Sequence, residues 1–263
     1  MSFLADILAN KRREVDILCR RARTGAVRTP IDVVAALRRR PGEPLRLIAE
    51  VKLRSPSAGE LSRALPPGER VLAYAEAGAA MVSVLCDEQF FDGSWEHMAA
   101  ARALLDQAGR AVPLLAKEFV IDERQIAESR DRGADAVLLI ARIVDPPKLL
   151  QLARAARSEG VEPLIEVTDE REVQMALAAE ARIVGVNARD LDTLTMDGER
   201  AARVCSAIPA DLVAVYLSGL RTAADVARLA PGRVDAALIG EALMRDDDPR
   251  ARLRVMVDAA RGE

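Results

Sequence analysis

Eight short apolar segments alternate with helical segments along this chain, and this alternation restricts the fold more than any other feature. The segments between them space apolar residues at helical intervals, as in the stretches that begin at residues 69, 122, 146 and 170. A strand followed by a helix, repeated, is typical of βαβ units that build a parallel sheet. The strand candidates are residues 45–51, 81–85, 112–116, 136–140, 163–167, 183–186, 212–216 and 236–239.

Eight such repeats favour an α/β (β/α)8 TIM barrel over a doubly wound sheet, which more often stops at about five to seven strands. The chain has 263 residues and 50% apolar composition, which is enough to bury a large core. No Ser/Gly linker or low-complexity tract divides it. We therefore predict a single (β/α)8 barrel domain over residues 1–263.

The N-terminal residues 1–44 are expected to form a helical extension ahead of the first strand. The stretch "MSFLADILANKRREV" is amphipathic, and such a pattern predicts a helix that either packs on the barrel or acts as a lid. Packing is the simpler interpretation. The apolar residues at helical spacing are Phe3, Leu4, Ile7, Leu8, Val15 and Leu18.

Charge and cysteine usage exclude several classes of function. The net charge of -3 comes from 38 basic and 41 acidic residues spread along the chain, so binding to nucleic acid or to an acidic membrane is not expected. Three separated cysteines and one histidine argue against a disulfide framework or a zinc site. No apolar run approaches the ~18 residues of a membrane span, and no signal peptide is recognisable. We expect a cytoplasmic protein.

A weak internal repeat links "GADAVLLIA" at residue 133 to "RVDAALIGEAL" at residue 233. Asp135 and Asp235 hold the same position in the two segments, directly before a predicted strand. This similarity between two units also favours a barrel built from repeats.

Polar residues gather at the carboxyl ends of the predicted strands. In a (β/α)8 barrel, these ends meet at one mouth, where the active sites of such enzymes lie. We therefore predict an active site there, because surface charges without a function would be expected on the helices. The residues at these ends are Glu50, Lys52, Lys117, Glu118, Glu166, Asn187, Arg189, Ser218 and Gly219.

The types of these residues indicate proton transfer. Alternate residues of a strand share one face, so Glu50 and Lys52 lie side by side. In an apolar and cationic mouth, the pKa of Lys117 is expected to fall toward neutrality, which would suit a proton donor. Glu166 lies in the apolar "PLIEV" and needs a cation, which either lysine could supply. A structural ion pair for Glu50 and a turn role for Asn187 are the simpler alternatives.

A phosphate site is indicated after the last two strands. "LSGL" and "IGEAL" each place a glycine, Gly219 and Gly240, at a strand end before a helix, where backbone N–H groups favour an anion. In barrels, these two loops often bind a substrate phosphate. No Walker loop, dinucleotide fingerprint or HExxH motif is present, so neither a nucleotide nor a metal cofactor is expected.

The ordered motifs resemble the indole-3-glycerol phosphate synthase family of tryptophan biosynthesis. "IAEVKLRSPSAGEL" is similar to the hallmark of that family, and the later motifs "SVLCDEQFFDGS", "KEFVIDERQI", "GADAVLLIA", "LIEVTDE", "GVNARDLDTL" and "SGLRTAADVARL" follow in the same order. The resemblance implies a cofactor-free ring closure of 1-(2-carboxyphenylamino)-1-deoxyribulose 5-phosphate to indole-3-glycerol phosphate, with loss of carbon dioxide and water. It also implies association with other enzymes of the tryptophan pathway.

The resemblance also implies roles for individual residues. Lys117 would be the general acid that protonates the ketone, Glu50, Lys52 and Glu166 would serve the later proton transfers, and Asn187 would hold hydroxyl groups. Ser55 and Pro56 would lie near the anthranilate carboxylate. The aryl ring would lie against Phe90 or Phe91, Phe119 and Leu138, and the phosphate against Ser218, Gly219, Gly240 and Glu241.

The chain also departs from the family pattern. Leu217 stands where a glutamate is usual, and Tyr216 where a small residue is usual. Glu118 replaces the usual Asp, Ala116 an Arg, and Ala188 an Asn. Two alternatives therefore stay open at this level: a paralogue that acts on a modified anthranilate, and a degenerate barrel that serves as a pathway partner.

Overall fold

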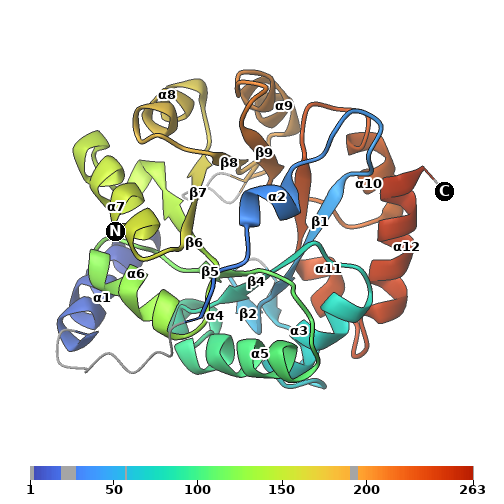
Figure 1. The fold of residues 1–263 in the computed structure, drawn as a ribbon, viewed down its shortest axis with the longest axis horizontal. Coiled ribbons are helices and arrows are strands. Elements are labelled where there is room, and N and C mark those ends of the chain that lie inside the picture. The colour runs from blue at the N-terminus through green and yellow to red at the C-terminus, as the bar shows by residue number, and fades with distance from the viewer. Residues whose placement is uncertain (1–2, 19–27, 57, 190–194, 263) are drawn as a thin grey trace.

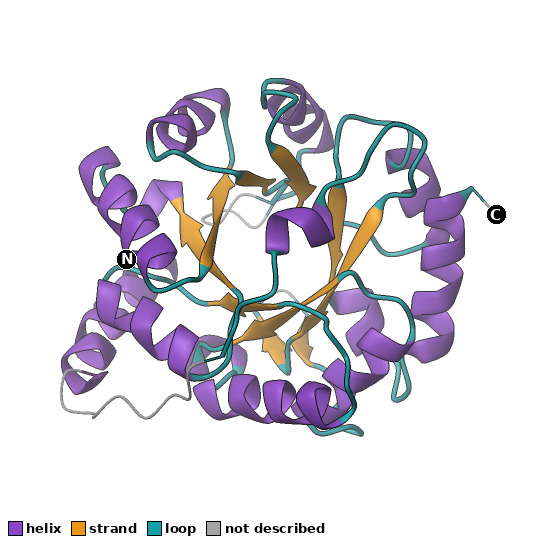
Figure 2. Ribbon diagram, viewed as in Figure 1, coloured by secondary structure: helices purple, strands orange, loops and turns teal. Residues whose placement is uncertain are grey.

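The computed structural model describes residues 3–18, 28–56, 58–189 and 195–262. Eight parallel strands form a closed barrel in the order β1-β10-β9-β8-β7-β6-β5-β4, with helices around the outside (Figures 1 and 2). This confirms the predicted (β/α)8 fold. The barrel strands are β1 (Arg46–Val51), β4 (Met81–Leu85), β5 (Leu114–Lys117), β6 (Ala136–Ile140), β7 (Glu162–Val167), β8 (Ile183–Val186), β9 (Val213–Tyr216) and β10 (Ala236–Ile239).

Four of these strands have the predicted bounds, and the others differ by one or two residues. The largest difference is at β5, which was predicted from residue 112 and begins at Leu114. Pro113 lies directly before it and has no N–H to donate to a neighbouring strand. The strand also continues one residue further than predicted, so Lys117 belongs to the strand itself.

Helices follow the strands, and most begin at a side chain that caps them. The carboxylates of Asp87, Asp122, Asp145, Asp169 and Asp197 each accept a backbone N–H in the first turn, the usual role of Asp at an N-cap. The helices around the barrel are α3 (Pro67–Glu76), α4 (Glu88–Phe91), α5 (Trp95–Gln107), α6 (Glu123–Asp131), α7 (Pro146–Ser158), α8 (Glu170–Ala178), α9 (Gly198–Ser206), α10 (Ala223–Leu229), α11 (Glu241–Met244) and α12 (Arg250–Arg261).

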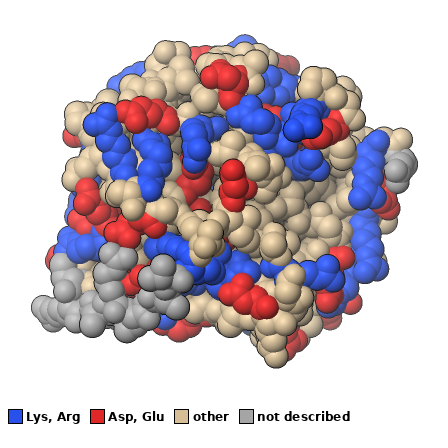
Figure 3. Space-filling view, in the orientation of Figure 1, with Lys and Arg blue, Asp and Glu red and all other residues tan. Residues whose placement is uncertain are grey.

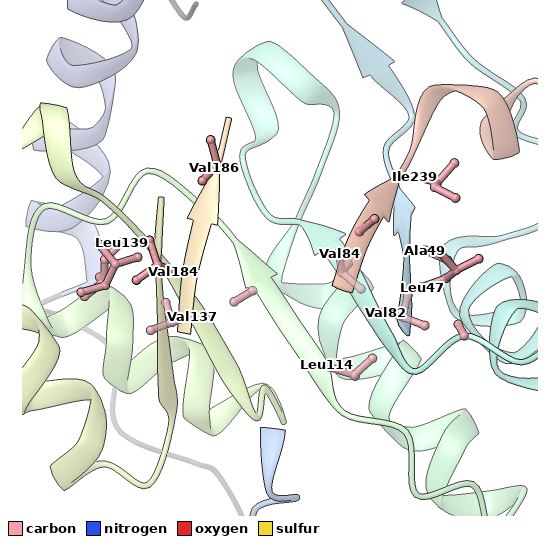
Figure 4. Close-up of a cluster of buried hydrophobic side chains, with 14 of the residues drawn as sticks. Leu47, Ala49, Val82, Val84, Leu114, Val137, Leu139, Val184, Val186 and Ile239 are labelled. Carbon is pink, nitrogen blue, oxygen red and sulfur yellow. The ribbon is translucent and has the colours of Figure 1, made fainter. Parts of the chain in front are cut away.

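The alternation of side chains along the strands produces two apolar layers. Residues such as Leu47, Val82 and Val137 face outward and pack against the helices (Figure 4). Their neighbours Ile48, Met81 and others face the barrel interior and form a separate buried cluster. A residue two positions beyond an interior residue therefore also points into the barrel, and this rule places the functional side chains described below.

The described part of the N-terminal extension contains two helices, α1 (Phe3–Leu18) and α2 (Val33–Leu37). Helix α2 lies in front of the barrel in Figure 1, and its Val33 and Leu37 belong to the interior cluster, so it closes that end of the barrel. Acidic and basic side chains are interspersed on this face (Figure 3). Helix α1 packs near α6 at the side of the barrel.

Asp135 and Asp235, the repeated pair of the sequence, attach this extension to the barrel. Asp135 accepts hydrogen bonds from the backbone N–H groups of Leu114 (3.0 Å) and Ile31 (2.9 Å). Asp235 accepts the equivalent bonds from Ala214 (2.9 Å) and Arg39 (3.3 Å). Each aspartate thus joins a strand of one half of the barrel to the segment that carries α2. Among the described residues, no helix is long and apolar enough to cross a membrane.

Candidate active site

A pocket lies at the carboxyl ends of the strands, with one polar and one apolar side. Several of its residues lie two positions beyond an interior residue of their strand, as Glu50 follows Ile48, Lys117 follows Leu115 and Glu166 follows Leu164. The predicted site residues that line it are Glu50, Lys52, Ser55, Pro56, Phe91, Lys117, Phe119, Leu138, Glu166, Asn187, Arg189 and Ser218.

A chain of hydrogen bonds runs across the polar side of the pocket. The Lys117 ammonium donates to Glu166 Oε2 at 3.1 Å, and Asn187 Nδ2 donates to Glu166 Oε1 at 2.9 Å. The Ser218 hydroxyl donates to Asn187 Oδ1 at 2.8 Å. Glu166 is thus held from both sides, and Ser218, which also lines the pocket, is linked to Glu166 through Asn187. The Arg189 backbone N–H also donates to Asn187 Oδ1, at 3.0 Å.

Glu50 and Lys52 lie side by side, as predicted, and they form the ion pair that was the simpler alternative, with 3.3 Å between Lys52 Nζ and Glu50 Oε1. The second Glu50 oxygen accepts a hydrogen bond at 3.3 Å from the buried hydroxyl of Ser83, the residue opposite it on β4. Sequence reasoning missed Ser83 because a lone serine in the apolar "MVSVL" carries no signal of its own. Glu50 is 4% exposed, so it needs these partners.

The expected fall in the pKa of Lys117 is wrong. Burial by itself lowers this pKa, but the carboxylates of Glu166 and Glu50 outweigh burial and raise it above the ordinary value. The sequence interpretation assumed a cationic mouth, whereas the structure surrounds this ammonium with anions. Lys117 is therefore protonated at neutral pH and can donate a proton, although it is a weak acid.

Glu118 directly follows β5 and, although it also borders the pocket, its carboxylate has different partners from the Lys117 ammonium. It is buried beside Lys11 of helix α1, with 2.9 Å between Lys11 Nζ and Glu118 Oε1. Burial raises the pKa of Glu118 to about 7 against the opposing effect of the Lys11 ammonium, and the nearby Asp87 carboxylate adds to the rise.

This pKa predicts a pH-dependent stability. Because the folded pKa lies above the ordinary 4.5, the folded chain holds this proton more tightly than the unfolded chain. The stabilisation is complete below pH 4.5 and is lost as the pH rises through about 7. Between pH 5 and pH 8, the free energy of unfolding should fall by about 2–3 kcal/mol more in the parent chain than in Glu118→Gln.

Urea unfolding of the parent chain and of Glu118→Gln at both pH values measures this difference. The exposed Glu96→Gln is the control, and equal pH slopes in the parent and Glu118→Gln would contradict the assignment.

Gly240 leaves room for Glu50. A Cβ atom at this position would lie 2.7 Å from Glu50 Oε1, closer than packed atoms allow. Gly240→Ala should therefore displace the carboxylate and lower kcat by about 10²-fold, since small misplacements in a site are costly. The control is Gly198→Ala, whose added Cβ meets nothing within 4 Å. Steady-state kinetics of both variants test this. An unchanged kcat in Gly240→Ala would show that the reaction does not depend on the exact position of the Glu50 carboxylate.

Four predicted site residues do not line the pocket. Phe90 turns to helix α1, where its ring meets Phe3 edge to face at 5.5 Å. The Glu241 carboxylate pairs with Arg245 at 2.7 Å, so only its backbone could face a phosphate. Gly240 lies directly between β10 and α11, as predicted. Gly219 does not match the prediction as closely: it lies beyond the end of β9, has a positive φ of 97°, and is separated from α10, which begins at Ala223.

The two departures at the end of β9 point in opposite directions. Leu217 follows the interior residue Val215, lines the pocket and fits because Gly185 beside it has no side chain. Tyr216 packs against the outer layer, between strands and helices. Tyr216 therefore cannot contact a ligand in this pocket, which corrects its use as a sign of altered substrate choice.

Helix α1 supplies part of the apolar side of the pocket, which sequence reasoning did not assign. The lining includes Phe3, Leu4 and Ile7 from this helix, together with Leu85 and Ile140 from the barrel. The amphipathic pattern predicted the helix, but only its position on the barrel shows that its first turns border the pocket.

Comparisons with known proteins agree with this geometry. The sequence profile of the family described as "Indole-3-glycerol phosphate synthase" matches residues 4–256. "Indole-3-glycerol phosphate synthase" of Chloroherpeton thalassium is 40% identical over 255 residues, covering 94% of this chain and 96% of that protein. "Indole-3-glycerol phosphate synthase 2" of Streptomyces coelicolor is 42% identical over 253 residues, covering 96% and 95%.

Solved structures with similar folds show a likeness of architecture alone. 3-Hexulose-6-phosphate synthase from Salmonella typhimurium superposes with a TM-score of 0.64 at 15% identity and covers 82% of this chain and 98% of that chain. Thiamine phosphate pyrophosphorylase from Pyrococcus furiosus gives 0.62 at 14% identity, covering 84% and 98%. Both similarities support the barrel and carry no information on the substrate.

Proposed function

This chain belongs to the indole-3-glycerol phosphate synthase family, and from that premise we propose how its pocket carries out the reaction of the family. The chain is a decarboxylating lyase of tryptophan biosynthesis that forms indole-3-glycerol phosphate. The observation that supports the assignment of roles is the Lys117 ammonium in the pocket, bonded to Glu166 and within the electrostatic influence of Glu50.

Lys117 is the general acid of the ring closure. As the aryl carbon attacks the ketone carbon of the substrate, negative charge develops on the ketone oxygen, and a nearby ammonium stabilises it and donates its proton. The carboxylates that raise the pKa of Lys117 keep it protonated until then. Carbon dioxide leaves from the ring carbon that formed the new bond, and the electrons of the broken bond restore the aromatic ring. Water leaves after a second proton reaches the hydroxyl, and the adjacent methylene carbon loses a proton. Glu50, Lys52 and Glu166 serve these later proton transfers.

Substrate binding divides along the two sides of the pocket. The aryl ring lies against Phe91, Phe119 and Leu138, with its carboxylate near Ser55 and Pro56. Asn187 holds the hydroxyl groups, and Arg189 adds positive charge. The phosphate lies at the loops of Ser218, Gly219, Gly240 and Glu241, where backbone N–H groups at strand ends favour an anion.

A fluorescence assay for indole-3-glycerol phosphate tests this function directly. The purified chain should convert 1-(2-carboxyphenylamino)-1-deoxyribulose 5-phosphate to the fluorescent indole product. Absence of product while the substrate still binds would contradict the proposal. It would favour a modified anthranilate substrate, to which the apolar Leu217 in the pocket wall points. Parallel assays with ring-substituted substrates separate these two outcomes.

We also propose a cytoplasmic location, because the phosphorylated substrate is a charged metabolite that does not cross membranes unaided. Association with other tryptophan-pathway enzymes stays a prediction. Co-purification of the tagged chain from cells with those enzymes would test it.

A further inference from the structure

Helix α1 carries a fully buried lysine, Lys11, on the face that packs against the barrel and outside the reaction pocket. Lys11 has 0% exposure, and its ammonium lies 2.7 Å from Glu14, 2.7 Å from Asp87 and 2.9 Å from Glu118. Removing an ammonium and carboxylates from water costs several kcal/mol per ion, so this cluster is a weak source of stability. The cluster is better explained as a device that fixes the positions of the elements that carry these side chains.

Asp87 connects Lys11 to helix α4. One oxygen of this carboxylate contacts the ammonium, and the other caps α4 by accepting the backbone N–H of Phe90 at 2.7 Å. Helix α4 carries both Phe90, which meets Phe3 of α1, and Phe91, which lines the pocket. A movement of Asp87 would therefore move both rings.

Glu118 connects Lys11 to the end of β5. The same oxygen that contacts the ammonium accepts the backbone N–H of Phe119 at 2.6 Å. The Phe119 ring lies 6.0 Å from that of Phe91, so the second carboxylate also reaches the aromatic wall. Lys117 is the preceding residue and points to the polar side.

Helix α1, helix α4 and the segment after β5 thus meet at one ammonium, and all three contribute to the apolar side of the pocket. We propose that Lys11 is a positioning residue that sets the affinity of the pocket for the aromatic half of the substrate. The inference deepens the proposed function, because it assumes that an aryl group occupies this side. Within the described residues, no hydrogen bond or ion pair joins Lys11 or its three carboxylate partners to the loops after β9 and β10.

Equilibrium binding tests the inference without relying on turnover. Anthranilate, followed by its own fluorescence, probes the aryl side, and inorganic phosphate, as a competitor of the substrate, probes the phosphate loops. In Lys11→Met, the affinity for anthranilate and 1/KM of the substrate should fall by about tenfold. The affinity for phosphate should stay within twofold and kcat within threefold. The matched control Arg12→Met changes the next, exposed residue of the same helix and should leave all four values unchanged.

A second variant keeps the test decisive if Lys11→Met does not fold. Lys11→Met with Glu118→Gln removes one positive and one negative charge, leaves fewer unpaired buried carboxylates, and should show the same selective loss. Unchanged anthranilate affinity in either folded variant overturns the inference, as does an equal loss of anthranilate and phosphate affinity. If the parent chain binds anthranilate more tightly than Lys11→Met but forms no indole product, the proposed function is refuted and the inference is supported.

Discussion

Replacing Lys117 with alanine should lower kcat by about 10³- to 10⁴-fold while the substrate affinity stays within about tenfold. The ketone oxygen is neutral in the bound substrate and becomes negatively charged in the transition state, so the ammonium stabilises the transition state more than the bound substrate. Its loss therefore affects the chemical step more than binding. Glu166 would then lose the cation with which it pairs, whereas Glu50 would keep Lys52. Single-turnover fluorescence, together with substrate binding measured separately, distinguishes these effects.

Two further variants make this result specific. Lys117→Arg keeps the positive charge but is a poorer acid with a different geometry, so kcat should remain low while binding is retained. Lys148→Ala removes a half-buried lysine of α7 that does not line the pocket, and it should leave both constants unchanged. Turnover near the parent value in Lys117→Ala would remove this residue as the acid and direct attention to Lys52.

The second large effect concerns stability. Asp135→Ala should lower the free energy of unfolding by about 3–5 kcal/mol, because removing one partner of a buried charge network leaves the others uncompensated. This carboxylate accepts two backbone N–H bonds, pairs with Arg28 at 2.5 Å and lies 3.7 Å from the buried Arg102. Urea unfolding followed by circular dichroism measures the change.

Asp106→Ala is the matched control. This carboxylate also pairs with Arg102, at 2.8 Å, but its side chain is 54% exposed, and surface ion pairs contribute about 0–1 kcal/mol. The two variants thus remove an acid from the same arginine in different environments. Equal losses of stability would show that the backbone bonds of Asp135, and with them the attachment of the N-terminal extension, contribute little.

The strand ends show how far a sequence can predict a site. Glu50, Lys117 and Glu166 were predicted to converge because the barrel brings the carboxyl ends of its strands to one mouth, and they do lie together. The hydrogen bond of the Ser83 hydroxyl and the burial of Lys11 were not predicted. The sequence around Ser83 is that of an ordinary core strand, and the sequence around Lys11 is that of an ordinary solvated helix face. In retrospect, Lys11 lies four residues from both Ile7 and Val15, in the middle of the buried stripe of α1.

Charge states were the least predictable property. The pKa of Lys117 was expected to fall and instead rises, because its sign depends on which side chains from other strands lie within a few ångströms. Tyr216 and Leu217 show the same dependence on geometry: although they are adjacent in sequence at the end of β9, one packs in the outer apolar layer and the other in the interior cluster.

The sequence alone determined the order of strands and helices, the barrel they form, the family, and the strand ends that carry the chemistry. These follow from local periodicity and from motifs that are contiguous in the chain. Only the tertiary structure decided how Lys117, Glu166 and Asn187 are bonded, which rings form the pocket wall, and how helix α1 is held by Lys11. Those features depend on contacts between residues far apart in sequence, and such contacts set the desolvation and Coulomb energies of each group.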